Sequence, residues 1–210
     1  MKISFGERIE HQDASKVYIA ALASFPALFL VGALFRNAHI ETILLDYNRY
    51  KSTWYRLNEF SGTHESVHHV LADDETMGYE EKLDRILEND PTEVGVALAY
   101  TFEIPHEQIP EELKEHTLFL KNSFGYGHDR LSDKESQKKL LSELSPLFNK
   151  IYKSNGVKKI HLFVAAQASM AIALGLHYMD NAHGTIVLHN YDNQTKSHNW
   201  SVKFNKGEVG

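Results

Sequence analysis

The sequence contains an internal duplication. A segment at residues 15–54 aligns with a second segment at residues 158–200, and this places Gly32 on Gly175 and matches the apolar positions of the two segments. After one inserted residue in the second copy, both copies carry the tripeptide Asn-Ala-His, and both close on a tryptophan. Self-similarity of this kind indicates that the chain builds the same structural unit twice.

Each copy has the pattern of a strand, a helix and a second strand. The first strands are predicted at residues 18–22 and 160–164, where short apolar runs are typical of strands buried on both faces. Small residues follow, then a helix, then second strands at residues 40–45 and 185–189. Such a unit forms a parallel sheet with a right-handed crossover. The predicted fold class is therefore α/β, with two pseudo-symmetric Rossmann-like units whose first strands are equivalent and central.

The first copy also allows a different interpretation. Residues 17–35 contain no charged side chain, and a stretch of that length can cross a bilayer. The equivalent part of the second copy, however, holds His161, Gln167, His177 and Asp180, which a lipid-exposed helix would tolerate poorly. Because the two copies should fold alike, the sequence favours a strand and a helix over a membrane span.

Further elements lie between the copies, and no Pro-, Gly- or Ser-rich linker separates them. We expect one domain over residues 1–210, with a first half at about 15–125 and a second half at about 126–210. The predicted elements are a helix at 80–88, strands at 92–104 and 116–121, and an amphipathic helix at 133–153, which is the first helix of the second half (about 131–153).

Composition narrows the classes of function. The formal net charge is −6, so a duplex nucleic acid is not an expected partner. The chain has no cysteine, which excludes disulfides and thiolate zinc sites and is compatible with a reducing cytoplasm. The N-terminal residues are polar and include acidic side chains, unlike a signal peptide. We therefore expect a cytoplasmic protein that makes no membrane contact through this domain.

The carboxyl ends of the predicted strands are the expected ligand site, because open parallel sheets bind ligands there. The helix N-termini that follow the first strands offer N–H groups to phosphate. Polar and aromatic residues follow the second strands, and a glycine-containing loop follows another strand. The predicted ligand-binding residues are Ala23, Ser24, Phe25, Pro26, Tyr47, Asn48, Arg49, Lys51, Trp54, Ser123, Phe124, Gly125, Ala166, Gln167, Ala168, Ser169, Tyr191, Asn193, Lys196 and Trp200.

Residue chemistry suggests roles within this set. Arg49, Lys51 and Lys196 are predicted to contact phosphates. Tyr47, Trp54, Tyr191 and Trp200 are predicted to stack on bases, although the two tryptophans also suit a core. This combination of aromatic faces, amides and cations is what a nucleotide needs.

One motif points elsewhere. Residues 64–68 read His-Glu-Ser-Val-His and fit HExxH, the pattern of zinc hydrolases. The chain is rich in histidine, Gly62 and Thr63 precede the motif, and no third ligand follows at a recognised spacing. A zinc hydrolase therefore stays the lowest alternative, and we predict no metal ligand, no catalytic residue and no cofactor.

The sequence resembles the SAVED domain, a family built as two fused CARF-like halves. The resemblance is carried by YIAALASFPALFLVGALF at residues 18–35, and by the helix LSPLFNKIY at residues 144–152, which leads into KKIHLFVAAQASMAIALGLHYM at residues 158–179. Within the last segment the spacing of Ala166, Ala171, Leu174 and Gly175 is the most specific part.

The resemblance implies a function. Members of the family sense cyclic oligonucleotides in anti-phage defence, in CBASS or type III CRISPR systems. It implies a cyclic tri- or tetranucleotide, adenylate-containing, bound between the halves, head-to-tail self-association, and an effector module fused upstream or in a separate chain. We therefore expect a non-catalytic sensor. The alternative is a ring nuclease that cleaves the messenger, with His128, His189 or His198 as acid or base.

Overall fold

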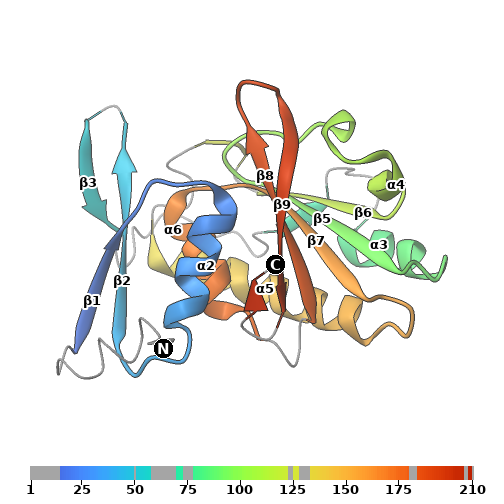
Figure 1. Ribbon diagram of the computed structural model, residues 1–210, viewed down its shortest axis with the longest axis horizontal. Coiled ribbons are helices and arrows are strands. Elements are labelled where there is room, and N and C mark those ends of the chain that lie inside the picture. The colour runs from blue at the N-terminus through green and yellow to red at the C-terminus, as the bar shows by residue number, and fades with distance from the viewer. Residues whose placement is uncertain are drawn as a thin grey trace.

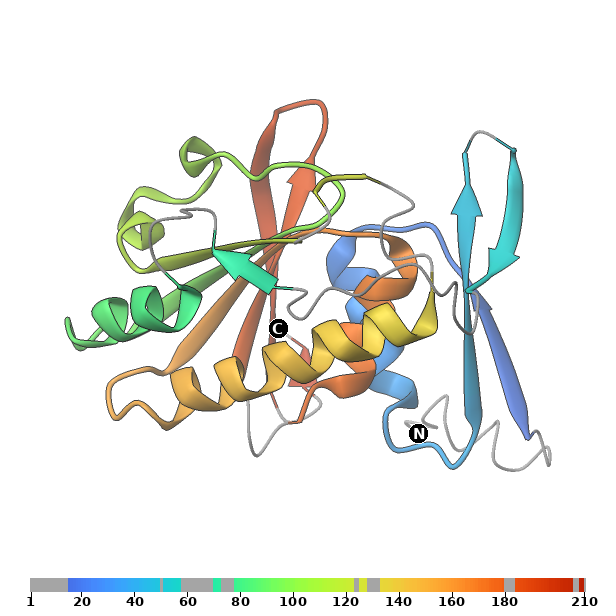
Figure 2. The ribbon, with the colours of Figure 1, turned by 180° about the vertical axis from the view of Figure 1, so that it is seen from behind.

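Two β-sheets enclose a layer of helices (Figures 1 and 2). The computed structural model describes residues 15–49, 51–57, 70–72, 78–122, 125–127, 133–179, 184–205 and 208–209. A three-stranded sheet has the order β1-β2-β3, and a seven-stranded sheet has the order β10-β9-β8-β7-β5-β6-β4. Helices α2 and α6 lie between the two sheets, and α5 crosses beside them (Figure 2). The observed fold class is α/β, as predicted.

The strands are β1 (Lys16–Ala20), β2 (Glu41–Asn48), β3 (Thr53–Arg56), β4 (Val70–Ala72), β5 (Glu93–Ala99), β6 (Thr117–Asn122), β7 (Lys159–Ala165), β8 (Thr185–Asp192), β9 (Ser197–Asn205) and β10 (Glu208–Val209). The helices are α2 (Phe25–Phe35), α3 (Tyr79–Leu87), α4 (Glu111–Lys114), α5 (Lys134–Lys153) and α6 (Ala168–His177), with a short 3-10 helix at His106–Gln108.

Strand register confirms the duplication. β1 pairs in parallel with β2, and β7 pairs in parallel with β8. Lys16 lies opposite Glu41, and the aligned residues Lys159 and Thr185 lie opposite each other in the second copy. The next pairs along each ladder correspond in the same way. In both copies the second strand then turns back into an antiparallel third strand, β3 or β9.

The two repeat helices pack against each other through the aligned glycines. A Cβ atom added to Gly32 would lie 1.9 Å from the carbonyl oxygen of Ile172, and one added to Gly175 would lie 1.9 Å from that of Phe29. Ile172 and Phe29 are themselves aligned residues of the duplication. The helix pair therefore has local twofold symmetry, and glycine at both positions allows the two backbones to approach this closely.

The main hydrophobic core lies between the helices and the large sheet. β7 is central and buried along most of its length, as expected for a strand covered on both faces. Helix α5 begins after Asp133, whose carboxylate accepts a 2.8 Å hydrogen bond from the backbone N–H of Ser136. Its apolar side is the one predicted, with Leu140, Leu144 and Ile151 almost fully buried.

The first copy differs from two expectations. β1 is an edge strand, not a central one, and it is buried on one face only: Tyr18 is 62% exposed. The reason is that the small sheet meets the helices on one side, and no described helix or strand covers its other side (Figure 1). β5 also ends at Ala99, earlier than predicted, and a bend follows at residues 100–102.

Sheet membership changes between β3 and β4, and not near residue 125. β5 pairs in parallel with both β6 and β7, so the strands between the copies extend the sheet of the second copy. β4 joins the same sheet through an antiparallel pairing with β6. The predicted halves therefore do not coincide with the two sheets.

The uncharged stretch at residues 17–35 is divided between β1 and α2, as the comparison of the two copies predicted. Helix α2 has 11 residues, which is too few to span a bilayer. Within the described ranges, no helix is both long and apolar enough to cross a membrane.

Candidate functional site

A pocket lined by both polar and apolar residues lies where the two copies meet, at the carboxyl ends of their strands. It has a volume of about 480 Å³ and receives residues from both copies, and we call it the inter-repeat pocket. The β2–β3 and β8–β9 hairpins project on the same side of the molecule (Figure 1). Its lining residues are Leu22, Ala23, Leu28, Asp46, Tyr47, Asn48, Arg49, Tyr55, Thr101, Phe102, Ala166, Gln167, Ala168 and Asn193.

The structure brings eight of the predicted residues together in this lining: Ala23, Tyr47, Asn48, Arg49, Ala166, Gln167, Ala168 and Asn193. Arg49 and Asn193 are aligned residues of the duplication, as are Ala23 and Ala166. Two segments far apart in the sequence thus form one cavity because the repeat helices are packed together.

Other predicted residues are not among the described lining residues: Ser24, Phe25, Pro26, Lys51, Trp54, Gly125, Ser169, Tyr191, Lys196 and Trp200. Lys51 and Lys196 lie in the turns of the two hairpins. Trp54 and Trp200 are 37% and 43% exposed, so neither is a core residue. Ser123 and Phe124 lie outside the residues that the structure describes.

Sequence reasoning missed six lining residues: Leu22, Leu28, Asp46, Tyr55, Thr101 and Phe102. Asp46 on β2 lies directly opposite Tyr55 on β3. Asp46 comes one residue before the predicted Tyr47, and Tyr55 comes one residue after the predicted Trp54. Thr101 and Phe102 follow β5, whose place beside β7 the duplication does not reveal. Extending the predicted loops by one residue would have included Asp46 and Tyr55.

The N-terminus of α6 is capped by a residue of the other copy. The backbone N–H of Ser169 donates to Asp46 Oδ1 at 2.9 Å, and the Ser169 hydroxyl donates to Asp46 Oδ2. Gln137 on α5 donates its side-chain N–H to the same hydroxyl at 2.7 Å. All three side chains are buried. A carboxylate at this position is stabilised by the positive end of the helix dipole.

The N-terminus of α2 is built differently. Pro26 stands where Ser169 stands in α6, and it has no N–H to donate. The aligned residue of Asp46 is the neutral Asn190, which is half-buried on β8. No acidic residue lies in the first turn of α2. The two helix N-termini that the sequence treats as equivalent therefore differ in charge.

Thr101 adds a polar group to the wall of the pocket. Its backbone N–H donates to the carbonyl oxygen of Ala165, at 2.9 Å, which fixes the chain beside β7. The Thr101 hydroxyl is buried and has no hydrogen-bond partner among the described residues. A buried hydroxyl without a partner is costly, so its presence in a pocket wall is consistent with a ligand that supplies one.

Aromatic side chains surround the pocket. Phe102 is 47% exposed, and its ring centroid lies 6.4 Å from that of Tyr191. Tyr47 meets Trp54 edge to face, with centroids 5.3 Å apart. Exposed aromatic faces of this kind are suited to stacking on nucleobases.

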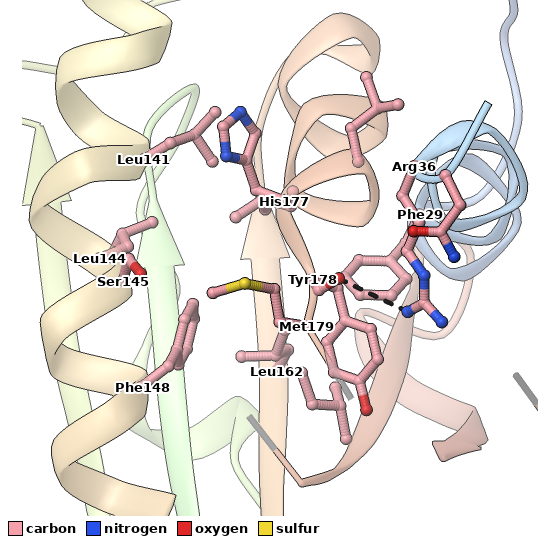
Figure 3. A pocket seen from close by; sticks show the side chains of 14 residues that line it. Phe29, Arg36, Leu141, Leu144, Ser145, Phe148, Leu162, His177, Tyr178 and Met179 are labelled. Atoms are coloured by element: carbon pink, nitrogen blue, oxygen red, sulfur yellow. Dashed lines mark hydrogen bonds between the residues drawn. The ribbon is translucent and has the colours of Figure 1, made fainter. Parts of the chain in front are cut away.

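A second pocket lies at the opposite end of the helix pair and is mostly apolar (Figure 3). Its volume is about 630 Å³, and Leu144 and Phe148 of α5 and Met179 point into it. Arg36 Nη1 lies at its edge and donates to the carbonyl oxygen of Tyr178 at 3.5 Å. Its apolar wall suits a polyanionic ring less well than the inter-repeat pocket does.

A row of three histidines, His161, His189 and His198, crosses neighbouring strands of the large sheet. His161 Nε2 lies 2.7 Å from Glu93 Oε2, and His161 Nδ1 lies 2.9 Å from His189 Nε2. His198 Nδ1 lies 3.2 Å from the carbonyl oxygen of Gln108. None of the described residues that line the inter-repeat pocket is a histidine. His189 and His198, considered as acid or base of a ring nuclease, are thus not lining residues, and His128 lies outside the residues that the structure describes.

These histidines should make the stability of the domain fall at mildly acidic pH. Burial, with the neighbouring His161 and His198, lowers the pKa of His189 to about 3, and burial also lowers the pKa of His161 and of His198. In the unfolded chain these three side chains take up protons near pH 6.5, whereas in the folded chain they do so only at lower pH. Their contribution to stability is therefore fully present above pH 6.5 and is lost as the pH drops toward 3.

For His189 alone the expected loss between pH 7 and pH 5 is about 2 kcal/mol. Urea unfolding at the two pH values measures it. His189→Gln should reduce the difference, whereas the same change at the exposed His39 should leave it unchanged. Equal stability of the wild-type chain at pH 7 and pH 5 would contradict this interpretation.

The HExxH motif at residues 64–68 lies outside the residues that the structure describes. Among the described residues, no group of three or more His, Asp or Glu side chains is arranged to hold a metal ion. The zinc alternative therefore gains no support from the described part of the chain.

Comparison with known proteins identifies the family. The model of the SAVED family, the SMODS-associated and fused to various effectors sensor domain, matches residues 3–204. The chain belongs to the SAVED family. The resemblance inferred from the sequence is confirmed, and this chain is a SAVED sensor domain.

Solved structures of SAVED receptors have the same fold. The Cap4 SAVED/CARF-domain containing receptor of Acinetobacter baumannii, solved with the cyclic trinucleotide 3'3'3'-cAAA, matches with a TM-score of 0.60 and 18% identity. The same receptor with 2'3'3'-cAAA gives equal values. The Cap4 receptor of Moraxella osloensis matches with a TM-score of 0.51 and 16% identity. At this identity the likeness concerns the fold alone.

Coverage of these matches is unequal. The A. baumannii receptor matches over 90% of this SAVED chain but only 39% of its own, and the M. osloensis receptor over 97% and 38%. The SAVED chain thus spans about two fifths of the length of the receptors it matches. A search of curated proteins by sequence gave no significant match.

Proposed function

We propose that this SAVED domain senses a cyclic oligonucleotide, an adenylate-containing tri- or tetranucleotide, in anti-phage defence. The ring binds in the inter-repeat pocket, between the two copies of the duplicated unit. The observation that carries the proposal is that one pocket gathers eight predicted ligand residues from both copies. The A. baumannii receptor with the same fold was solved with cyclic trinucleotides.

The chemistry of the pocket supports a small anionic ring. Arg49 offers a forked cationic donor, and Asn48, Gln167 and Asn193 offer amides for base edges. The aromatic rings at the rim offer stacking surfaces. In a protein of net charge −6 these groups favour a compact ligand over a nucleic-acid polymer.

A thermal-shift screen against cyclic di-, tri- and tetranucleotides tests the proposal. A ring present at 100 times its Kd should add about 2.7 kcal/mol to the free energy of unfolding. Linear oligonucleotides of the same composition are the control, because they carry the same bases without the closed ring. Equal shifts with linear and cyclic molecules, or no shift with any ring, would contradict the proposal.

Ligand binding should also drive assembly. We place the effector in a module fused upstream or in a separate chain, and head-to-tail stacking of SAVED domains would bring effectors together. The two copies differ in sequence, so the outer faces of the domain differ, and contacts between unlike faces build open stacks. A cyclic oligonucleotide promotes stacking only if it binds stacked domains more tightly than single domains.

Size-exclusion chromatography with light scattering should show a monomer without ligand. With a saturating concentration of the cyclic oligonucleotide it should show larger species. The Arg49→Ala variant at the same ring concentration is the control, and it should form fewer of these species. A chain that binds a ring tightly and stays monomeric at all concentrations would rule out stacking by this domain.

A further inference from the structure

Residues beside the N-termini of both repeat helices line the pocket: Ala23 lies just before α2, and Ala168 is the first residue of α6. Asp46 caps α6, whereas α2 has no side-chain cap and no acidic residue in its first turn. We propose that Asp46 is a specificity-determining residue, which keeps phosphate away from α6 and leaves α2 as the helix N-terminus that can receive it. This inference rests on the proposed function for the nature of the ligand. It deepens that function by fixing how a ring is oriented in the pocket.

Asp46 forms hydrogen bonds with the N-terminus of α6. Its two carboxylate oxygens accept from the backbone N–H and the hydroxyl of Ser169, in the first turn of α6. These are the groups that a bound phosphate would otherwise use at a helix N-terminus. Gln137 supports the arrangement from α5 through its bond to the Ser169 hydroxyl. The protein itself therefore supplies the anion of this site.

The negative charge of Asp46 also repels a ligand phosphate from the N-terminus of α6. Asp46 is among the residues that line the inter-repeat pocket, although it is only 3% exposed. A buried negative charge acts through a low-dielectric wall and repels a second anion at short range. The part of a cyclic oligonucleotide that lies against α6 is therefore base or sugar. Gln167, whose side-chain N–H lies 3.4 Å from Asp46 Oδ2, is a polar neighbour of that part of the ligand.

The N-terminus of α2 can be compared with that of α6 through the aligned residues. Alternation along β2 and β8 places Asp46 and Asn190 on the faces toward the helices, two residues beyond the aligned Leu44 and Leu188. Pro26 and Asn190 thus replace the Ser169 and Asp46 pair at α2. Neither brings a charge, so the dipole of α2 is not neutralised there. The same pocket also contains the Thr101 hydroxyl, which has no partner among the described residues.

Inorganic phosphate is the probe that tests this placement without any ring. In ¹⁵N-labelled wild-type chain, phosphate should shift the amide signals of Phe25 and Ala27 in α2 and leave those of Ser169 and Met170 in α6 unchanged. Asp46→Asn keeps the shape of the side chain and removes its charge, so it should add saturable shifts at Ser169 and Met170.

Asn190→Asp is the matched variant, because it gives α2 the carboxylate that α6 already has. It should abolish the phosphate shifts at Phe25 and Ala27 without disturbing the Asp46 contacts, so it decides the matter even if Asp46→Asn does not fold. Phosphate shifts at α6 in the wild-type chain, no shifts at α2, or unchanged α2 shifts in Asn190→Asp would each overturn the inference.

A ring adds a second measurement. Removing the Asp46 charge should tighten the binding of a ring identified by the thermal-shift screen by about threefold to tenfold. Weaker binding by a folded Asp46→Asn variant would overturn the inference, because it would make Asp46 a ligand contact. Failure of every ring to bind would contradict the proposed function, while the phosphate pattern would still decide the role of Asp46.

Discussion

Replacing Gly32 or Gly175 by alanine should unfold the domain or cost it most of its stability. Either new Cβ atom would lie 1.9 Å from a backbone carbonyl oxygen of the other helix, a distance that only backbone movement can relieve. Overpacking usually costs about 1–3 kcal/mol, and a clash with backbone should exceed that range. Because the contact is symmetric, we expect the two variants to lose similar amounts.

Urea unfolding of both variants measures the loss. Gly78→Ala is the matched control, since a Cβ atom there would meet nothing within 4 Å, and it should stay within about 1 kcal/mol of the wild type. A Gly32→Ala variant as stable as the wild-type chain would show that the helix pair is not packed as described.

Removing the Arg49 guanidinium should have the largest effect of a single side chain on ligand binding. Arg49 is the arginine among the described residues of the inter-repeat pocket, and a charged hydrogen bond to phosphate contributes about 1–3 kcal/mol. Arg49→Ala should therefore raise the Kd of the cyclic oligonucleotide by about fivefold to 150-fold. Titration calorimetry gives this ratio, and circular dichroism checks the fold.

Lys196→Ala is the matched control for Arg49. The sequence predicts a phosphate contact for both residues, but Lys196 lies in an exposed hairpin turn and is not among the described lining residues. We therefore expect a smaller change in affinity for Lys196→Ala than for Arg49→Ala. The opposite order would move the phosphate contact from the pocket to the hairpins.

The duplication allowed much of the fold to be predicted. It identified two strand–helix–strand units, and the register of β1 with β2 repeats in β7 with β8. It also paired Gly32 with Gly175, without showing that these glycines meet. Apolar patterning predicted α5 and its buried side correctly because a long amphipathic helix has a strong period.

Sheet partners and burial were harder to predict. An apolar run such as residues 18–22 has the composition of a central strand, but the position of β1 at an edge depends on which strands add to its sheet. β5 and β6 lie between the copies in sequence and pair with the second copy in space. Pairing over such distances leaves no local signal in the chain.

The residues of the candidate site were likewise predicted only in part. Loop chemistry at the strand ends predicted Asn48, Arg49 and Gln167, which the structure brings to one pocket. Asp46 was missed because it lies inside a strand, where its capping of α6 depends on tertiary packing. Thr101 was missed for the same reason, since only the pairing of β5 with β7 carries it to the pocket.

Hydrogen–deuterium exchange with and without a ring tests the central claim most directly, because it reports both binding and its location. A saturating cyclic triadenylate, or the ring that gives the largest thermal shift, should slow amide exchange in residues 22–28, 46–49 and 166–171, which border the inter-repeat pocket. No protection with any ring, or protection confined to residues 141–148 and 176–179 beside the apolar pocket of Figure 3, would contradict it.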